Sequence, residues 1–338
     1  MKKKVVLSIF IILISFLQNS CGSKRISKKI IVASSGKIES LDPARASTLK
    51  AIQLISSLGD TLYELNSDGE LIPELALGMP IISKDRLQIT INLRKNVFFH
   101  DGTAFNSNAI KFTFDRFKRI GTMNYILGNK IKSIETPSEY SVKINLNKPS
   151  SSLNGLLTSV NLTPVSPSFY KEYSDKFLNE KFVGTGKYVL TSFSNEVQSI
   201  DPNLNYWGEN PLNNGINFVG YSNSSSLFGA LKSKQIDVLL SNSIDDSQRK
   251  TLNNLSKNKK FNEGSSPFTE LSFISLKTSS YPLSNLNLRL ALAKSLNRKL
   301  ISEKVSYGLR KPSRSIIPPI LKKDNKELWP KYDYLEAR

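Results

Sequence analysis

The sequence has little of several residue types that define whole classes of proteins. It contains one cysteine, Cys21, one histidine, His100, and two tryptophans among 338 residues. A single cysteine cannot close an internal disulfide, and one cysteine with one histidine cannot complete a zinc site built from those ligands. The composition therefore excludes disulfide scaffolds and zinc modules of that kind, and we expect neither a metal nor a cofactor.

Acidic residues are also scarce, since 28 Asp and Glu stand against 47 Lys and Arg, which gives a formal net charge of +19. A charge of this size raises nucleic acid as a partner, but a nucleic-acid reader clusters its basic residues with stacking aromatics on one element. Only 12 of the basic residues are arginine, and beyond the amino-terminus the basic runs are short pairs such as Lys259 and Lys260. The charge indicates a solvated lysine-rich surface, and no nucleic-acid partner is expected.

The amino-terminus has the order of an export signal. Lys2, Lys3 and Lys4 precede an uncharged, mainly apolar run over 5–17, and the small residue Ser20 precedes Cys21. The run is too short to cross a bilayer as a helix. The segment resembles a bacterial lipoprotein signal, which implies cleavage before Cys21 and a lipid on its thiol; ordinary secretion is the alternative. We predict a signal peptide over 1–20 and a polar tether over 21–29.

Hydrophobic periodicity beyond the tether switches between strand and helix without any repeat, which predicts a mixed α and β body. The predicted strands cover 30–33, which is buried, 87–93, which 97–99 continue up to a turn over 100–102, and 142–146. One predicted helix covers 47–58, with Ser47 or Thr48 as its cap and Leu49, Ile52 and Ile55 facing inward. A second helix begins after Asn106 or Ser107, with Ile110, Phe114 and Phe117 facing inward.

Several blocks of sequence then point to one family. The segment 85–102, DRLQITINLRKNVFFHDG, is the most specific of them. The other blocks occur along the chain in the same order as in the family: SLDP at 40–43, DGELIPELA at 68–76, GTGKY at 184–188, NYWG at 205–208 and LRLALA at 288–293. The chain resembles the family 5 extracellular solute-binding proteins, which are the peptide, dipeptide and nickel receptors of ABC importers.

The resemblance implies an α/β fold of the two-lobed periplasmic-binding-protein kind, type II, with an extra β-rich domain inserted in the first lobe. Carried onto this chain, lobe I covers 30–64 and 183–268, the inserted domain covers 65–182, and lobe II begins at 269. Lobe II of such proteins needs well over a hundred further residues, so it is expected to be incomplete at residue 338.

The resemblance also implies where a ligand is held. Ser47 and Thr48, and less directly Tyr125 and Asn161, are predicted to face the cleft. Each has a structural alternative, which is helix capping for Ser47 and Thr48, packing for Tyr125 and a loop hydrogen bond for Asn161. Gly184 and Gly186 are predicted either to act as a hinge between lobes or to make a tight connection.

No arrangement of nucleophile and base, or of paired carboxylates, indicates an enzyme. The family implies a periplasmic, lipid-anchored receptor that captures a small solute, most simply a peptide, and delivers it to an ABC permease and ATPase. The alternative is a truncated remnant without transport activity, or a basic protein that interacts with surfaces. The transported substrate cannot be identified from these blocks.

Overall fold

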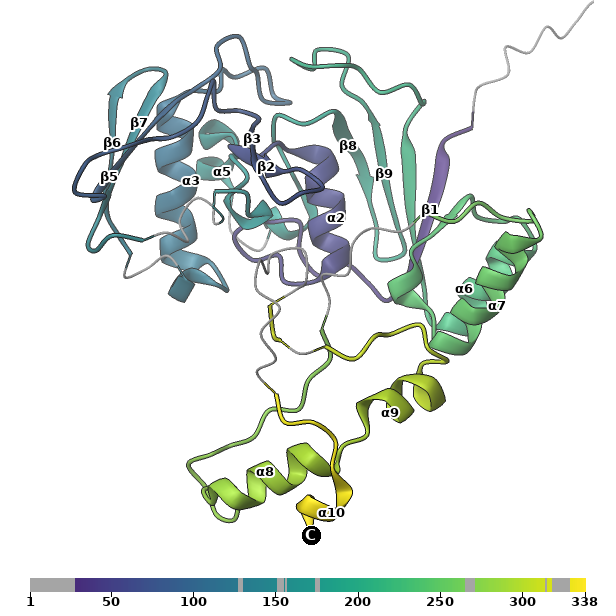
Figure 1. Cartoon of the computed structure of the whole chain (residues 1–338). Coiled ribbons are helices and arrows are strands. Elements are labelled where there is room, and N and C mark those ends of the chain that lie inside the picture. The colour runs from purple at the N-terminus through teal and green to yellow at the C-terminus, as the bar shows by residue number, and fades with distance from the viewer. Residues whose placement is uncertain are drawn as a thin grey trace, which may run out of the picture.

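The computed structural model describes residues 28–126, 130–150, 155, 157–173, 177–264, 271–313, 315–317 and 329–338. The predicted signal peptide and Cys21 lie outside these residues. No helix within the described ranges is long and apolar enough to cross a membrane. Figure 1 shows a body made of two sheets with their helices, and a carboxy-terminal group of helices beside it.

The larger sheet has five strands in the order β11, β1, β10, β9 and β8. Strand β1, second in this order, runs parallel to both β10 and β11, with Val32 opposite Phe218 on one side and Val238 on the other. Strands β9 and β8 continue the sheet in antiparallel pairing. The bounds are β1 Ile30–Ser35, β8 Tyr188–Phe193, β9 Val197–Pro202, β10 Ile216–Tyr221 and β11 Val238–Leu239.

Helices cover both faces of this sheet. Helix α2 (Leu49–Leu58) packs on one face in a core that includes Phe218, while α6 (Ser224–Lys232) packs on the other face in a core that includes Ala33. The helices that follow β1 and β10 therefore leave on opposite sides. This reversal is the point at which open α/β sheets form a crevice beyond the carboxyl ends of their strands.

The smaller sheet has four strands in the order β4, β5, β7 and β6, all antiparallel. Helix α3 (Ser107–Ile120) lies against it in a shared core, with Ile110 and Phe114 fully buried. The strands are β4 Ile81–Ile82, β5 Gln88–Asn92, β6 Ile131–Ser138 and β7 Ser141–Leu146, and a separate hairpin joins β2 Tyr63–Leu65 to β3 Leu71–Pro73. This β-rich unit lies between β1 and β8 in the sequence, where the inserted domain is predicted.

Short helices complete the body and its carboxy-terminal side. Around the two sheets lie η1 Asn124–Ile126, η2 Val160–Leu162, α5 Pro167–Glu172, η3 Phe177–Glu180, η4 Ser241–Ser243 and α7 Asp246–Lys257. Beyond them follow α8 Leu286–Ser295, α9 Arg298–Val305 and α10 Tyr334–Ala337. The predicted domain boundaries stay predictions: the one at 182/183 falls between η3 and β8, the one at 64/65 cuts β2, and the one at 268/269 lies outside the described residues.

Most predicted elements are present, but two details of the sequence interpretation are wrong. Residues 97–99 do not continue the sheet, because Phe98 makes only an isolated bridge to Ala104 while its neighbours Val97 and Phe99 are buried. In α2 the inward stripe consists of Ala51, Leu54, Ile55 and Leu58, and Leu49 is 51% exposed. The core meets that helix about one third of a turn away from the predicted face.

Candidate functional site

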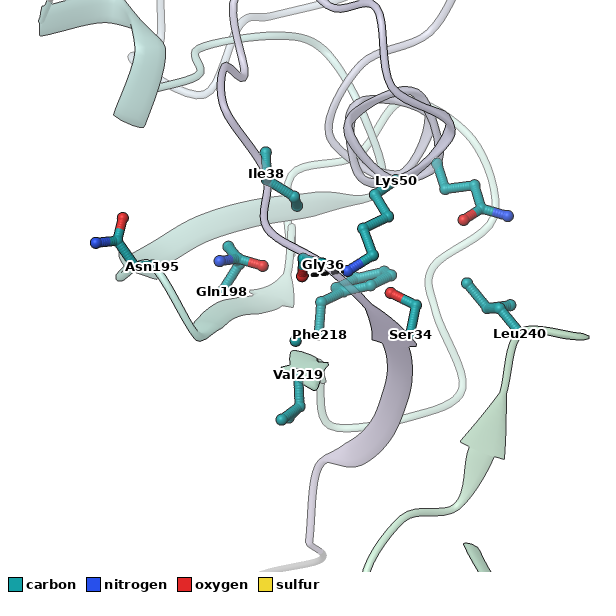
Figure 2. A pocket seen from close by; sticks show the side chains of 11 residues that line it. Ser34, Gly36, Ile38, Lys50, Asn195, Gln198, Phe218, Val219 and Leu240 are labelled. Atoms are coloured by element: carbon teal, nitrogen blue, oxygen red, sulfur yellow. Dashed lines mark hydrogen bonds between the residues drawn. The ribbon is translucent and has the colours of Figure 1, made fainter. Parts of the chain in front are cut away.

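A small pocket lies at the carboxyl edge of the larger sheet (Figure 2). Ser34 and Gly36 come from the end of β1, Val219 and Gly220 from the end of β10, and Lys50 from the first turn of α2. Parallel strands that end at one edge leave their backbone and first loop residues accessible there, so such an edge is the usual ligand site of open α/β sheets. The fold therefore puts a pocket at the position where a lobe of this kind meets its ligand.

Helix α2 directs Lys50 into the pocket. Thr48 is the N-cap residue, and its side-chain oxygen accepts a hydrogen bond of 3.3 Å from the Ala51 N–H, which fixes the first turn. The Lys50 ammonium donates to the Gly36 carbonyl oxygen at 2.5 Å, as Figure 2 shows. Burial lowers the pKa of Lys50 to about 8, because desolvation disfavours the charged form.

The loop that leads to α2 is held by side chains from α3 and η2. Asp42 is fully buried, and the guanidinium of Arg116 on α3 donates to both of its carboxylate oxygens at 2.5 Å. Asn161 on η2 donates from Nδ2 to the carbonyl oxygens of Pro43 and Ala46, at 2.7 and 2.8 Å. The loop over 42–46 therefore has fixed contacts on two sides before it reaches Ser47.

The Gly184-Thr185-Gly186 segment packs against the carboxyl end of α2. The Gly186 N–H donates to the Leu58 carbonyl oxygen at 3.0 Å. A Cβ atom on Gly186 would come within 2.4 Å of the Leu58 carbonyl carbon, and one on Gly184 within 2.7 Å of its oxygen. Both glycines thus allow the backbone of 184–186 to contact the backbone at the end of α2. This is the tight connection that the sequence offered as the alternative to a hinge.

A buried acidic group lies next to this connection. Asp60 accepts hydrogen bonds from the Thr185 hydroxyl and the Trp207 indole at 2.8 Å, and from the Tyr206 hydroxyl at 3.1 Å. Burial raises the pKa of Asp60, and it also raises the pKa of the nearby Glu74 to about 8, with the charge of Asp60 as the second cause. These contacts join the end of α2 to the segments over 184–186 and 205–208 and give Trp207 a structural role.

His100 belongs to the same connection. Its backbone N–H donates to the Gly184 carbonyl oxygen at 2.8 Å, and the ring atom Nε2 lies 3.1 Å from the Gly186 carbonyl oxygen. Burial lowers the pKa of His100, because the protonated ring would lose its hydration. Its partners are backbone atoms, and within the described ranges no group of three acidic, cysteine or histidine side chains could hold a metal ion.

The four residues that were predicted to face the cleft lie around one loop. Ser47 is exposed and Thr48 is half-buried. Asn161 is buried, and its side-chain amide donates to backbone carbonyl oxygens of the loop. Tyr125 is 76% exposed on η1, three residues after Thr122, whose N–H donates to the Ala44 carbonyl oxygen at 3.0 Å. The structure gives Thr48 and Asn161 the structural contacts that were their alternatives, and a ligand contact for any of the four stays a prediction.

Sequence reasoning missed Lys50, Gln53 and Arg116. Lys50 and Gln53 lie three residues apart on α2 and both line the pocket, a spacing that gives one face of a helix. That spacing was visible in the sequence, but nothing in the sequence showed that the residues face a sheet edge. Arg116 carried no signal, because its partner Asp42 is 74 residues away.

Comparison with known proteins identifies the relatives of this chain. The family described as bacterial extracellular solute-binding proteins, family 5, middle, matches residues 70–338. The chain belongs to this family. Its relatives include the glutathione-binding protein GsiB of Salmonella typhimurium, which is 26% identical over 317 residues, with 92% of this chain and 60% of that protein covered. The relatives are solute-binding receptors and not enzymes, as the sequence interpretation predicted.

Solved structures show the same fold at low sequence identity. The periplasmic binding protein DppA from Helicobacter pylori, solved with the peptide STSA, matches with a TM-score of 0.74 at 22% identity and covers 92% of this chain and 64% of that one. NikZ from Campylobacter jejuni, solved with Ni(L-His), matches with a TM-score of 0.73 at 23% identity, covering 91% and 61%. These matches confirm the predicted periplasmic-binding-protein fold. The chain spans about three fifths of the length of the curated relatives that it matches.

Proposed function

We propose that this family 5 chain captures a small solute outside the cytoplasmic membrane and passes it to an ABC permease and its ATPase. The observation that carries the proposal is the pocket at the carboxyl edge of β1 and β10, on a fold that the family uses for solute binding. The solute is a peptide or a peptide-like molecule. Relatives whose names state a ligand include a glutathione-binding protein and a protein solved with a peptide.

Capture of this kind depends on closure of a second wall over the first. A ligand bound between two lobes is protected from water on both sides, so its polar contacts are stronger than on one open surface. The proposed hinge between lobes is the segment with Gly184 and Gly186, because glycine permits a wide range of backbone angles and this segment lies at the predicted junction, just before β8. Ser47 and Thr48 precede the pocket residue Lys50 in the chain, and we propose that they border the ligand. Tyr125 is proposed to lie further from the ligand.

The proposed receptor is anchored by lipid on Cys21, which keeps it on the outer side of the membrane. Labelling with radioactive palmitate tests the anchor: wild type should carry label, and the Cys21→Ser variant should carry none and move to the soluble fraction. Two or more acyl chains are needed for stable anchoring. Equal labelling of both proteins, or no label in wild type, would disprove the anchor without touching the proposal of solute capture.

Uptake in cells tests the transport function. A strain that lacks this gene should import isotope-labelled di- to pentapeptides at a strongly reduced rate, and the gene supplied on a plasmid should restore the rate. A labelled sugar that enters by another route serves as the control for general transport. Unchanged peptide uptake in the deletion strain, with the protein shown to be produced in wild type, would refute peptide transport.

A further inference from the structure

The pocket at the sheet edge is large enough for one small polar group and no more. The pocket is partly open, and the free volume inside it is about 10 Å³, close to the space of one water molecule. A whole solute cannot enter it, but the end of a solute can. The pocket is therefore suited to recognise one chemical group on a molecule that otherwise lies outside it.

The charged group of the pocket has no counter-ion. Lys50 makes no ion pair with any described residue, and its ammonium meets only the carbonyl oxygen of Gly36. Lys111 on α3 is a useful contrast, because its ammonium pairs with Asp115 at 2.7 Å on the surface. A half-buried ammonium loses hydration and gains little from one neutral oxygen, so an added anion at this point is favoured.

Two further polar groups line the same pocket. The Ser34 residue is only 9% exposed, and its hydroxyl can donate a hydrogen bond or accept one. The side-chain oxygen of Gln53 is buried without a hydrogen-bond partner among the described residues. A buried acceptor without a donor is costly, and the cost is removed when a ligand brings an N–H group.

These groups complement a particular arrangement of atoms. The ammonium of Lys50 and the hydroxyl of Ser34 are able to donate to an anionic oxygen, and the oxygen of Gln53 is able to accept from an N–H group of the same ligand. We propose that this pocket is a subsite for one carboxylate of the solute, and that it selects solutes in which an amide N–H lies next to the carboxylate. The inference rests on the proposed function, because it assumes that the sheet edge faces the solute.

Two parts of a peptide carry this chemistry. The terminal carboxylate follows the last amide N–H, and an aspartate or glutamate side chain places a carboxylate near the N–H of its own residue. Both sources use the same pocket in the same way. Peptides that carry only one of the two carboxylates separate them.

The smallest probe of the subsite is N-acetylglycine, with N-acetylglycinamide as its neutral counterpart. The whole chain labelled with ¹³C-lysine is titrated with each compound, and the Lys50 side-chain signal is assigned with the Lys50→Arg variant. N-acetylglycine should move the Lys50 signal saturably and raise the pKa of that lysine, whereas the amide should not. Lys111, which already has a carboxylate partner, should stay unchanged with both.

Variants of Lys50 give the second measurement. Lys50→Met keeps the length of the side chain and removes its charge, and Lys50→Gln serves as a second variant if the first does not fold. The matched control is Lys111→Met. Saturable binding of N-acetylglycine should be lost in both Lys50 variants and kept in the control. Equal effects of N-acetylglycine and its amide on the Lys50 signal, or binding that persists in the Lys50 variants, would overturn the subsite.

Peptides then identify the source of the carboxylate. Trialanine, trialanine amide and Ala-Glu-Ala amide are compared by calorimetry. Amidation of trialanine should weaken binding at least tenfold if the terminal carboxylate is recognised, and Ala-Glu-Ala amide should restore it if a side chain is recognised. Equal affinity for all three would refute the subsite and leave the proposed peptide capture intact. Unchanged peptide uptake in the deletion strain would refute the proposed transport function. The N-acetylglycine titration would then still decide whether the pocket binds a carboxylate.

Discussion

Helices α2 and α3 of the body over 30–264 begin in the same way as helices α8 and α9 of the carboxy-terminal segment over 271–338, but the two pairs are buried very differently. Helices α2 and α3 have side-chain caps at Thr48 and Asn106, and each buries a stripe of residues in a core. Helices α8 and α9 also have side-chain caps, at Asn285 and Asn297, yet neither buries any residue within the described structure.

The difference shows that local signals form a helix and a partner surface buries it. Six leucines or isoleucines of α8 and α9 are between 36% and 57% exposed: Leu286, Leu288, Leu290, Leu292, Leu300 and Ile301. The segment meets α7 through polar contacts, since Arg310 donates to Asp246 at 3.1 Å and the Lys250 ammonium lies 4.8 Å from the centre of the Tyr307 ring. We expect substitutions in the body to cost far more stability than equivalent ones in the segment.

The largest contrast is expected between two ion pairs. Arg116→Ala leaves the carboxylate of Asp42 buried without its main partner, and breaking a buried pair in this way costs about 3–5 kcal/mol. Lys294→Ala removes the pair with Glu336, whose side chain is 62% exposed, and costs about 0–1 kcal/mol. Urea unfolding of both variants measures the difference. Similar midpoints for the two would contradict it.

Two leucines on helices provide the apolar version of this contrast. Leu54 on α2 is 0% exposed, and Leu54→Ala should destabilise the body by about 2–5 kcal/mol through lost burial and a cavity. Leu292 on α8 is 39% exposed, and Leu292→Ala should cost less than about 1 kcal/mol. Thermal unfolding followed by circular dichroism measures both, and a large loss for Leu292→Ala would reveal a partner surface for α8.

A pair of glycines tests the connection between α2 and β8. Gly186→Ala forces a Cβ to within 2.5 Å of the Gly59 nitrogen, so backbone must move, at a cost of about 1–3 kcal/mol. The control is Gly229→Ala inside α6, where the new Cβ meets open space and helix propensity favours alanine by about 0.5–1 kcal/mol. In denaturant unfolding, Gly186→Ala should lower the free energy of unfolding and Gly229→Ala should raise it. A neutral Gly186→Ala would mean that the connection is loose enough to yield.

The last contrast is a pH dependence, that of Glu74. The raised pKa, about 8 in the folded protein against about 4.5 in the unfolded chain, means that the folded state keeps a proton which the unfolded state releases. The contribution of Glu74 to stability therefore falls as the pH rises from 4.5 to 8 and is constant above that.

The Glu74→Gln variant tests this effect, because it imitates the protonated form and keeps an oxygen for the Thr61 donors. The variant should lose stability less steeply than wild type between pH 4.5 and 8, with the exposed Glu303→Gln as the matched control. Unfolding in urea at several pH values gives the slopes. Identical slopes for wild type and Glu74→Gln would show that the carboxyl is ionised in the folded protein.

The sequence was sufficient for features that depend on neighbouring residues. The alternation of Val142, Ile144 and Leu146 predicted β7, and the stripe of Ile110, Phe114 and Phe117 predicted α3, because a strand repeats every two residues and a helix every 3.6. The turn over 100–102 was predicted from similarly local signals, and Gly102 in this turn has a φ of +80°. Collinear motifs added the family and its fold, which the comparisons confirm.

Contacts between distant residues were decided only by the tertiary structure. The sequence marked Ser47 and Thr48 as candidates but passed over Lys50, because whether a lysine on an amphipathic helix faces water or a sheet edge depends on strands up to about 190 residues away. The buried partnership of Arg116 with Asp42 has the same origin, since a charge that looks solvated in sequence acquires its partner when α3 packs beside the loop. Local chemistry fixes the elements, and long-range packing chooses which of their side chains meet.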